Sequence, residues 1–141
     1  MKNKDEEPKE YFERSILLVA TVAIAGVLLD WFSISMLLDV NPWGTATAIP
    51  GLFLTFQGIS LIVNPYAIIY EDRFTINQSL IYNREFYYLD AKGFDAPSNN
   101  LIYNDNDLQK LPLLGMRASH KKLFKKRLAE KINESLTNRD F

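Results

Sequence analysis

The chain has 141 residues, a formal net charge of −1 and 48% hydrophobic residues, which leaves room for one modest domain and an anchor. It contains no cysteine and a single histidine, His120. This composition excludes disulfides, thiolate metal sites, cysteine nucleophiles and a zinc site built from several histidines. We interpret His120 as a surface residue at the beginning of a helix, not as a metal ligand or a general base.

The basic residues divide the chain into two kinds of segment. All 16 lysines and arginines lie outside residues 15–64, where two aspartates are the only charged side chains. Ser15–Leu29 and Ala46–Val63 are unbroken apolar runs inside this window. Because a helix needs about 20 apolar residues to cross a bilayer, we predict a membrane α-helical hairpin. Its predicted spans are residues 15–38 and 46–63.

Two other interpretations of these apolar runs are less consistent with the sequence. Buried helices of a globular core would have to be covered on all sides, because neither run has a polar face, and a small domain cannot cover them. Ala23-Ile24-Ala25 has the small-residue spacing of a signal-peptide cleavage site. The apolar character continues past it, however, and a second run follows. We therefore expect a retained anchor.

The positions of lysine and arginine predict the orientation. The loop that joins the two spans has none, whereas both flanks carry them, including Arg14, Arg73 and Arg84. Because cytoplasmic segments next to membrane spans are enriched in basic residues, we predict that residues 1–14 form a cytoplasmic tail and that both termini are cytoplasmic. We expect an integral membrane protein of the bacterial inner membrane.

Residues 65–137 are predicted to form a small α+β domain on the cytoplasmic side. Asn64-Pro65 ends the second span, since proline removes a backbone donor and disfavours helix in its predecessor. Short runs rich in aromatic and β-branched residues follow, which predict an antiparallel sheet. The predicted strands are Tyr66–Tyr70, Phe74–Asn77, Leu80–Tyr82, Phe86–Leu89, Leu101–Tyr103 and Leu108–Leu114. Residues 138–141 are expected to be a tail.

A C-terminal amphipathic helix is predicted to close the sheet, with Ser119 as its cap. Its apolar stripe has i, i+4 spacing and consists of Leu123, Phe124, Leu128, Ile132 and Leu136. Its other faces carry a basic cluster: Lys121, Lys122, Lys125, Lys126, Arg127 and Lys131. Three interpretations of this cluster stay open, namely a solvated face, contact with anionic membrane lipids and contact with a protein partner. Nucleic acid is not expected, because the sheet segment is net acidic and no recognition motif occurs.

Two polar residues of the predicted spans, Asp30 and Gln57, are candidate intramembrane sites, because a carboxylate within a span is a functional-site hypothesis. Counted from Tyr11 at about 1.5 Å per residue, Asp30 lies about 28 Å along the first helix, near the far edge of a roughly 30 Å core. Gln57 could form a hydrogen bond, but at a different depth. We therefore expect an interfacial Asp30 and keep an ion or proton relay as the alternative.

No catalytic constellation is recognisable in the sequence. Paired carboxylates, nucleophile–base pairs and glycine-rich phosphate loops are all missing. The acidic residues that follow the predicted strands are ordinary turn residues. We predict that the protein is not an enzyme and that it has no catalytic, cofactor-binding or metal-binding residues.

The motifs of the domain resemble those of small bacterial two-span membrane proteins with a pleckstrin-homology-like (PH-like) cytoplasmic domain. Tyr66–Ile76 is similar to the strand that follows the hairpin in that family, Tyr87–Asp90 to a later aromatic strand, and Lys110–Leu113 to the strand before the closing helix. The resemblance implies a partial PH-like barrel, for which about fifty residues of sheet predict five strands. It also implies a binding or scaffolding role.

The leading functional hypothesis is a non-enzymatic, membrane-anchored interaction or scaffolding protein. Its expected contacts are membrane lipids and either a protein partner or further copies of itself. One alternative is an accessory subunit of a membrane transport or channel assembly that uses Asp30. A membrane component of immunity or defence is a further alternative, which the small size of the chain permits.

Overall fold

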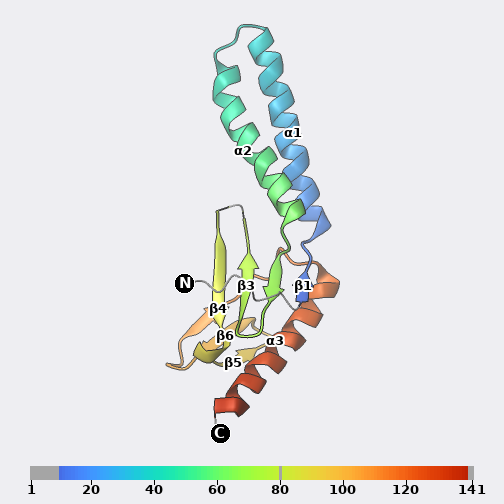
Figure 1. Ribbon diagram of the computed structural model, residues 1–141. Coiled ribbons are helices and arrows are strands. Elements are labelled where there is room, and N and C mark those ends of the chain that lie inside the picture. Colours follow the sequence, from blue (N-terminus) through green and yellow to red (C-terminus); the bar gives the residue numbers. More distant parts are fainter. Residues whose placement is uncertain (1–9, 80, 140–141) are drawn as a thin grey trace.

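Figure 1 shows a computed structural model of the protein, which describes residues 10–79 and 81–139. In chain order its elements are β1 (Glu10–Phe12), α1 (Ile16–Leu38), α2 (Trp43–Val63), β2 (Ala67–Ile69), β3 (Arg73–Asn77), β4 (Asn83–Tyr87), the 3-10 helix η1 (Tyr88–Asp90), β5 (Ala91–Asp95), β6 (Asn100–Tyr103), β7 (Leu108–Lys110) and α3 (Ala118–Arg139). The predicted combination of two long apolar helices, a small antiparallel sheet domain and a C-terminal helix is confirmed.

The two apolar helices form a hairpin that projects from the sheet domain (Figure 1). Both are long and apolar enough to cross a membrane. Only 11% of the most apolar window of α1, and 17% of that of α2, is buried. The described chain therefore does not cover these helices as a globular core would. α2 begins at Trp43, earlier than the predicted Ala46.

Small residues let the two helices pack closely. Gly26 of α1 and Gly58 of α2 are buried against the opposite helix. A Cβ atom on Gly26 would lie 2.7 Å from the backbone nitrogen of Thr55, and one on Gly58 would lie 3.1 Å from the Cα of Ala23. The backbones are thus nearly in contact, as at other helix interfaces built from small residues.

The strands form two antiparallel sheets, with the orders β1-β2-β3-β4 and β5-β6-β7. In the first sheet, Phe74 of β3 lies opposite Phe86 of β4. An isolated antiparallel bridge between Arg14 and Met116 joins the end of β1 to the segment after β7. Strand pairing does not continue around a closed barrel within the described residues, so the partial PH-like barrel stays a prediction.

Along the chain, the first strand comes before the hairpin, whereas the other strands of its sheet come after it. Residues 1–14 were expected to be a tail, but Glu10–Phe12 form β1 and pair with β2, with Phe12 opposite Ala67. The hairpin is therefore inserted between two neighbouring strands of one sheet. The tail prediction is wrong for these residues, because their pairing partner lies beyond both apolar helices in sequence; residues 1–9 lie outside the described part.

The described domain has seven strands, so the expectation of five is wrong. The sheets are built from very short strands, one of them drawn from before the hairpin, and β5 was not predicted. Leu80–Tyr82 was expected to be a strand, but Ile81 and Tyr82 precede β4, and Leu80 lies outside the described residues. The last predicted strand ends at Lys110, because Pro112 cannot donate to a ladder.

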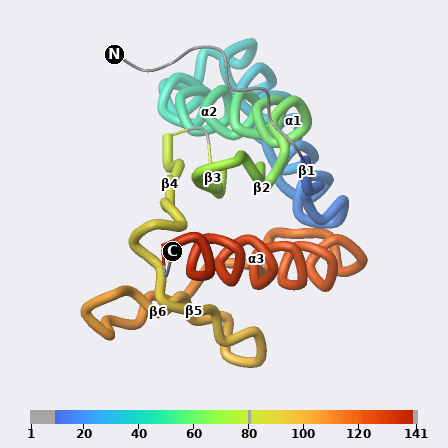
Figure 2. The backbone as a smooth tube through the Cα atoms, turned by 60° about the horizontal axis from the view of Figure 1, so that its bottom comes forward, coloured from blue at the N-terminus to red at the C-terminus, as the bar shows by residue number. Residues whose placement is uncertain are grey.

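The core lies between the two sheets and α3. Phe124 of α3 makes edge contacts with Phe12 of β1, at a centroid distance of 5.0 Å, and with Phe74 of β3, at 6.0 Å. Leu128 and Ile132 continue the buried stripe at i, i+4 spacing. Figure 2 shows α3 running between β1–β3 on one side and β5 and β6 on the other.

Two details of α3 differ from the prediction. Leu123 is 48% exposed and does not belong to the buried stripe. The helix begins at Ala118, so Ser119 lies inside it and is not its cap, and it continues to Arg139 through residues that were expected to form a tail.

Candidate functional site

Most cations of the basic cluster of α3 contact neighbouring groups. Four of its six cations have a partner in the described part of the chain. The contacts are Lys125 Nζ to the Ala96 carbonyl at 2.8 Å, Lys126 to Glu130 at 4.0 Å, Arg127 to Glu10 at 3.2 Å and to Glu130 at 3.1 Å, and Lys131 to Glu134 at 3.0 Å. Lys121 and Lys122 have no such contact among the described residues. The cluster is therefore not one uniform basic surface.

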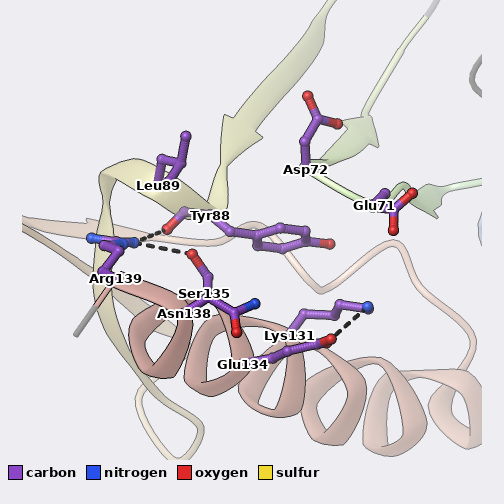
Figure 3. Close-up of a pocket in the computed structure, with 9 residues that line it drawn as sticks. All are labelled: Glu71, Asp72, Tyr88, Leu89, Lys131, Glu134, Ser135, Asn138 and Arg139. Carbon is purple, nitrogen blue, oxygen red and sulfur yellow. Dashed lines mark hydrogen bonds and ion pairs between the residues drawn. The ribbon is translucent and has the colours of Figure 1, made fainter. Parts of the chain in front are cut away.

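A polar pocket of about 320 Å³ lies between the β2–β3 turn, η1 and the last turns of α3 (Figure 3). Its lining consists of Glu71, Asp72, Tyr88, Leu89, Lys131, Glu134, Ser135, Asn138 and Arg139. Of the residues predicted from sequence as functional, only Lys131 is among them. The others come from three segments that are distant in sequence.

Tyr88 forms the wall of the polar pocket (Figure 3). Its ring stacks on Phe74 at a centroid distance of 5.9 Å, and its hydroxyl donates to the Tyr70 carbonyl at 3.4 Å. Burial raises the pKa of Tyr88 well above its usual range, and the carboxylates of Asp72 and Glu10 raise it further. The phenol is therefore a neutral donor at physiological pH and not a base.

Arg139 closes the pocket at the end of α3. Its Nη2 donates to the Tyr88 carbonyl oxygen at 2.5 Å and to Ser135 Oγ at 3.2 Å (Figure 3). It also donates to the Ala91 carbonyl oxygen at 3.0 Å. These contacts hold the guanidinium against the backbone of η1 and β5. The pocket can accept a polar or cationic side chain, with Leu89 as an apolar contact.

The described residues contain no group of three or more His, Cys, Asp or Glu side chains that could hold a metal ion. No protein-family model, curated protein or solved structure matches the chain. The functional argument therefore depends on the geometry of the molecule itself.

Arg14 is the centre of the junction between hairpin and sheet domain. It is buried, and its guanidinium donates to the carbonyl oxygens of Asn64 at 3.2 Å, Gln78 at 3.3 Å and Asn77. Burial lowers the pKa of Arg14, whereas the neighbouring Tyr66 raises it. Arginine remains charged in proteins, so a single cation joins the end of α2 to the end of β3.

Further contacts fix the foot of the hairpin. The amide of Ser15 donates to the Gly115 carbonyl at 2.8 Å, and the amide of Arg117 donates to the Glu13 carbonyl at 3.0 Å. His120 was expected to be a surface residue. It lies at the beginning of α3 and its Nδ1 accepts from the amide of Glu13 at 3.0 Å. The hairpin is thus attached to β1, α3 and the loop before α3.

Asp30 lies between the helices and not at their far end. α1 begins at Ile16, so at about 1.5 Å per residue Asp30 lies about 21 Å along it, and not the 28 Å counted from Tyr11. Its Oδ2 accepts from the Thr55 hydroxyl of α2 at 2.6 Å. Thr55 was not predicted as a donor to Asp30, and the interfacial position of Asp30 stays a prediction.

We expect Asp30→Asn to leave the hairpin intact, because an amide oxygen can still accept from Thr55. Asp30→Leu and Thr55→Val should each weaken helix association by about 1 kcal/mol, the usual size of such an interhelical hydrogen bond. Loss of helicity during an SDS titration, followed by circular dichroism in mixed micelles, measures this difference. Equal stability of all four proteins would show that the pair does not hold the helices together.

Proposed function

We propose that the protein is a non-enzymatic, membrane-anchored binding module. In this proposal the sheet domain lies at the cytoplasmic face of a bacterial membrane and binds a partner protein there. The observation that carries the proposal is the insertion of the hairpin between β1 and β2. Because both ends of the anchor belong to one sheet, the domain keeps a fixed orientation relative to its anchor. A flexible tether could not present one surface in this way.

Several features support the anchor and its orientation. α1 and α2 have the length and composition of membrane spans. The connection between them contains no lysine or arginine, whereas the other ends of both helices lie beside basic residues such as Arg14 and Arg117, which favours a cytoplasmic domain. Antiparallel sheets of four and three strands with a closing C-terminal helix support a PH-like fold for this domain. That fold in turn agrees with a binding role.

The polar pocket is the surface that we propose for the partner. α3 begins beside the foot of the hairpin, where Arg117 contacts Glu13, and Arg139 at its other end closes the pocket. The pocket therefore lies at the end of the domain farther from the anchor, where a partner in the cytoplasm can reach it. Its lining contains both acidic and basic side chains, and Leu89 is 63% exposed. A partner segment with a polar side chain next to an apolar one would complement this mixed lining.

The test compares two exposed leucines in protein isolated from native membranes in mild detergent. We expect Leu89→Asp to reduce the amount of co-purifying partner at least tenfold, because the substitution replaces a buried apolar contact at the centre of the proposed interface with a charge. Leu123→Asp, on the half of α3 nearer the hairpin, should retain it. A photo-crosslinking residue at position 89 should form an adduct with the same partner. A monomer without adducts, or equal losses in both variants, would contradict the proposal.

One observation favours a second candidate function, an accessory subunit of a transport or channel assembly. Asp30 is half-buried between the helices and accepts a hydrogen bond from Thr55, and a carboxylate within a membrane span is a candidate proton carrier. This function requires that Asp30→Asn abolish an ion- or proton-dependent phenotype while the hairpin stays intact. Unchanged transport in that variant would leave Asp30 with a packing role only.

A further inference from the structure

We propose that the sheet domain also contacts the lipid bilayer directly, through an apolar tip beside α2 and a second apolar side chain beside α1. The tip consists of Ile81 and Tyr82, which precede β4, and the second contact is Leu114, which precedes α3. The proposed occupant of this surface is the headgroup layer of the leaflet into which the hairpin enters. The inference depends on the proposed membrane anchor and extends it.

The tip lies level with the end of α2. The amide of Gln78 donates to the Tyr82 carbonyl at 3.0 Å, so these two residues are side by side. Arg14 donates both to the Gln78 carbonyl and to the carbonyl of Asn64, the residue that ends α2. Figure 1 shows β3 and β4 extending toward the hairpin and ending beside it. Tyr82 is therefore at the height of the last residues of α2.

Ile81 lies one residue farther toward the hairpin, which corresponds to about 3 Å of extended chain. The side chains of the last turn of α2 at this height, Ile62 and Val63, are themselves exposed apolar groups. A membrane that covers them would also reach Ile81. Apolar side chains of surface-bound segments typically lie 5–10 Å into the boundary between headgroups and acyl chains.

The chemistry of the tip matches this location. Ile81 is 80% exposed. Arg84 Nε donates to the Tyr82 hydroxyl at 2.7 Å, and the guanidinium lies 5.0 Å from the centre of the Tyr82 ring. Tyrosine and arginine both place apolar atoms in lipid and polar atoms in the headgroup layer.

The second contact has the same relation to α1. Leu114 is 92% exposed, and the next residue, Gly115, accepts the amide of Ser15 at the beginning of α1. Arg117 follows, with its side chain paired to Glu13 at 2.8 Å and still half exposed. One apolar side chain with an arginine nearby thus lies beside each helix of the hairpin.

Because the anchor already holds the domain at the membrane, a few exposed side chains are sufficient for contact with the bilayer. A domain that is tethered to the membrane meets the bilayer at a high effective concentration, so insertion of a few side chains occurs without a membrane-binding helix. Because hydrogen bonds around Arg14 hold the hairpin against the domain, the contacts on both sides of the hairpin can form together. They would fix the rotation and tilt of the domain, and thereby the direction in which the polar pocket opens.

Single-cysteine variants test this directly, since the chain has no cysteine of its own. The full-length protein would be labelled with the fluorophore NBD at Ile81→Cys, Leu114→Cys, Ile62→Cys or Leu108→Cys. It would then be reconstituted into vesicles of phosphatidylcholine and phosphatidylglycerol. Ile62, on α2, reports the anchor. Leu108 is 65% exposed and follows the β6–β7 turn, where Asn104 contacts Arg139 at the far end of α3. Quenching by lipids that carry a doxyl group near the headgroup is the readout.

We expect quenching at positions 62, 81 and 114 to exceed that at position 108 by about twofold or more, with blue-shifted emission, as for probes at the headgroup boundary. Quenching at 62 but not at 81 and 114 would overturn this inference and leave the anchor in place. No quenching at 62 would remove the proposed anchor as well. A blue shift at 81 without quenching, which grows with the protein-to-lipid ratio, would assign the tip to a second protein copy and also overturn the inference.

Discussion

Replacement of Arg14 by leucine is expected to destabilise the sheet domain by about 3 kcal/mol, since hydrogen bonds to a charged group contribute about 1.5–3 kcal/mol each and are not additive. Three backbone carbonyls, those of Asn64, Asn77 and Gln78, share this guanidinium as a donor. Leucine would leave these buried carbonyl oxygens without their hydrogen-bond donor. Thermal unfolding in detergent, followed by circular dichroism at wavelengths that report the sheet, measures the loss.

Arg14→Lys is the matched variant for this experiment. Lysine keeps the charge, but its three N–H donors are all on one nitrogen. They cannot reach carbonyls on different sides, as the donors of the planar guanidinium do. We expect an intermediate loss of stability. If the leucine variant unfolded at the temperature of the unmodified protein, the hairpin and the domain would not be joined through Arg14.

Replacement of Gly26 by leucine is expected to separate the two helices of the hairpin. A Cβ atom there would lie 2.7 Å from the Thr55 backbone nitrogen and 3.0 Å from the Leu54 carbonyl carbon. Backbone atoms in a helix cannot move aside as a flexible side chain can, so the helices must shift and the Asp30–Thr55 hydrogen bond is lost. Overpacking of this kind costs about 1–3 kcal/mol, to which the lost hydrogen bond adds.

The neighbouring residue supplies the control. Ala25 is exposed on the outer side of α1, so Ala25→Leu adds the same side chain where nothing obstructs it. We expect only Gly26→Leu to lower the SDS concentration at which the hairpin loses helicity. In a second readout, a disulfide engineered across the interface should form more slowly in that variant alone. An equal response of the two variants would mean that α1 and α2 do not pack through this glycine.

Local patterns made the helices predictable. The two hydrophobic runs, and the i, i+4 spacing of Phe124, Leu128 and Ile132, are visible within short windows of sequence. The first strand was missed for the opposite reason. Glu10 pairs with Ile69, and nothing within three residues of either reveals a partner so far along the chain.

The errors around β4 have a different origin. β-branched and aromatic residues favour strands, so Ile81 and Tyr82 were assigned to one, although they are exposed beyond the end of the ladder. β-propensity reflects how well a residue packs on a sheet. It does not distinguish such residues from apolar residues whose side chains face outward. The polar pocket was likewise not predictable, because Asp72, Tyr88 and Arg139 meet only once the sheet and α3 are in place.

The position of the hairpin inside the sheet has a consequence for biosynthesis. β1 leaves the ribosome before both apolar helices, and its partner β2 follows them, so for a chain anchored as proposed the sheet cannot form until both helices have been inserted. Because the chain crosses the membrane twice, β2 emerges on the same side of the bilayer as β1. A chain in which only one helix crossed would hold the two strands on opposite sides of the bilayer. The domain would stay open, with its apolar core residues accessible to proteases that remove defective membrane proteins, so its closure reports that insertion succeeded.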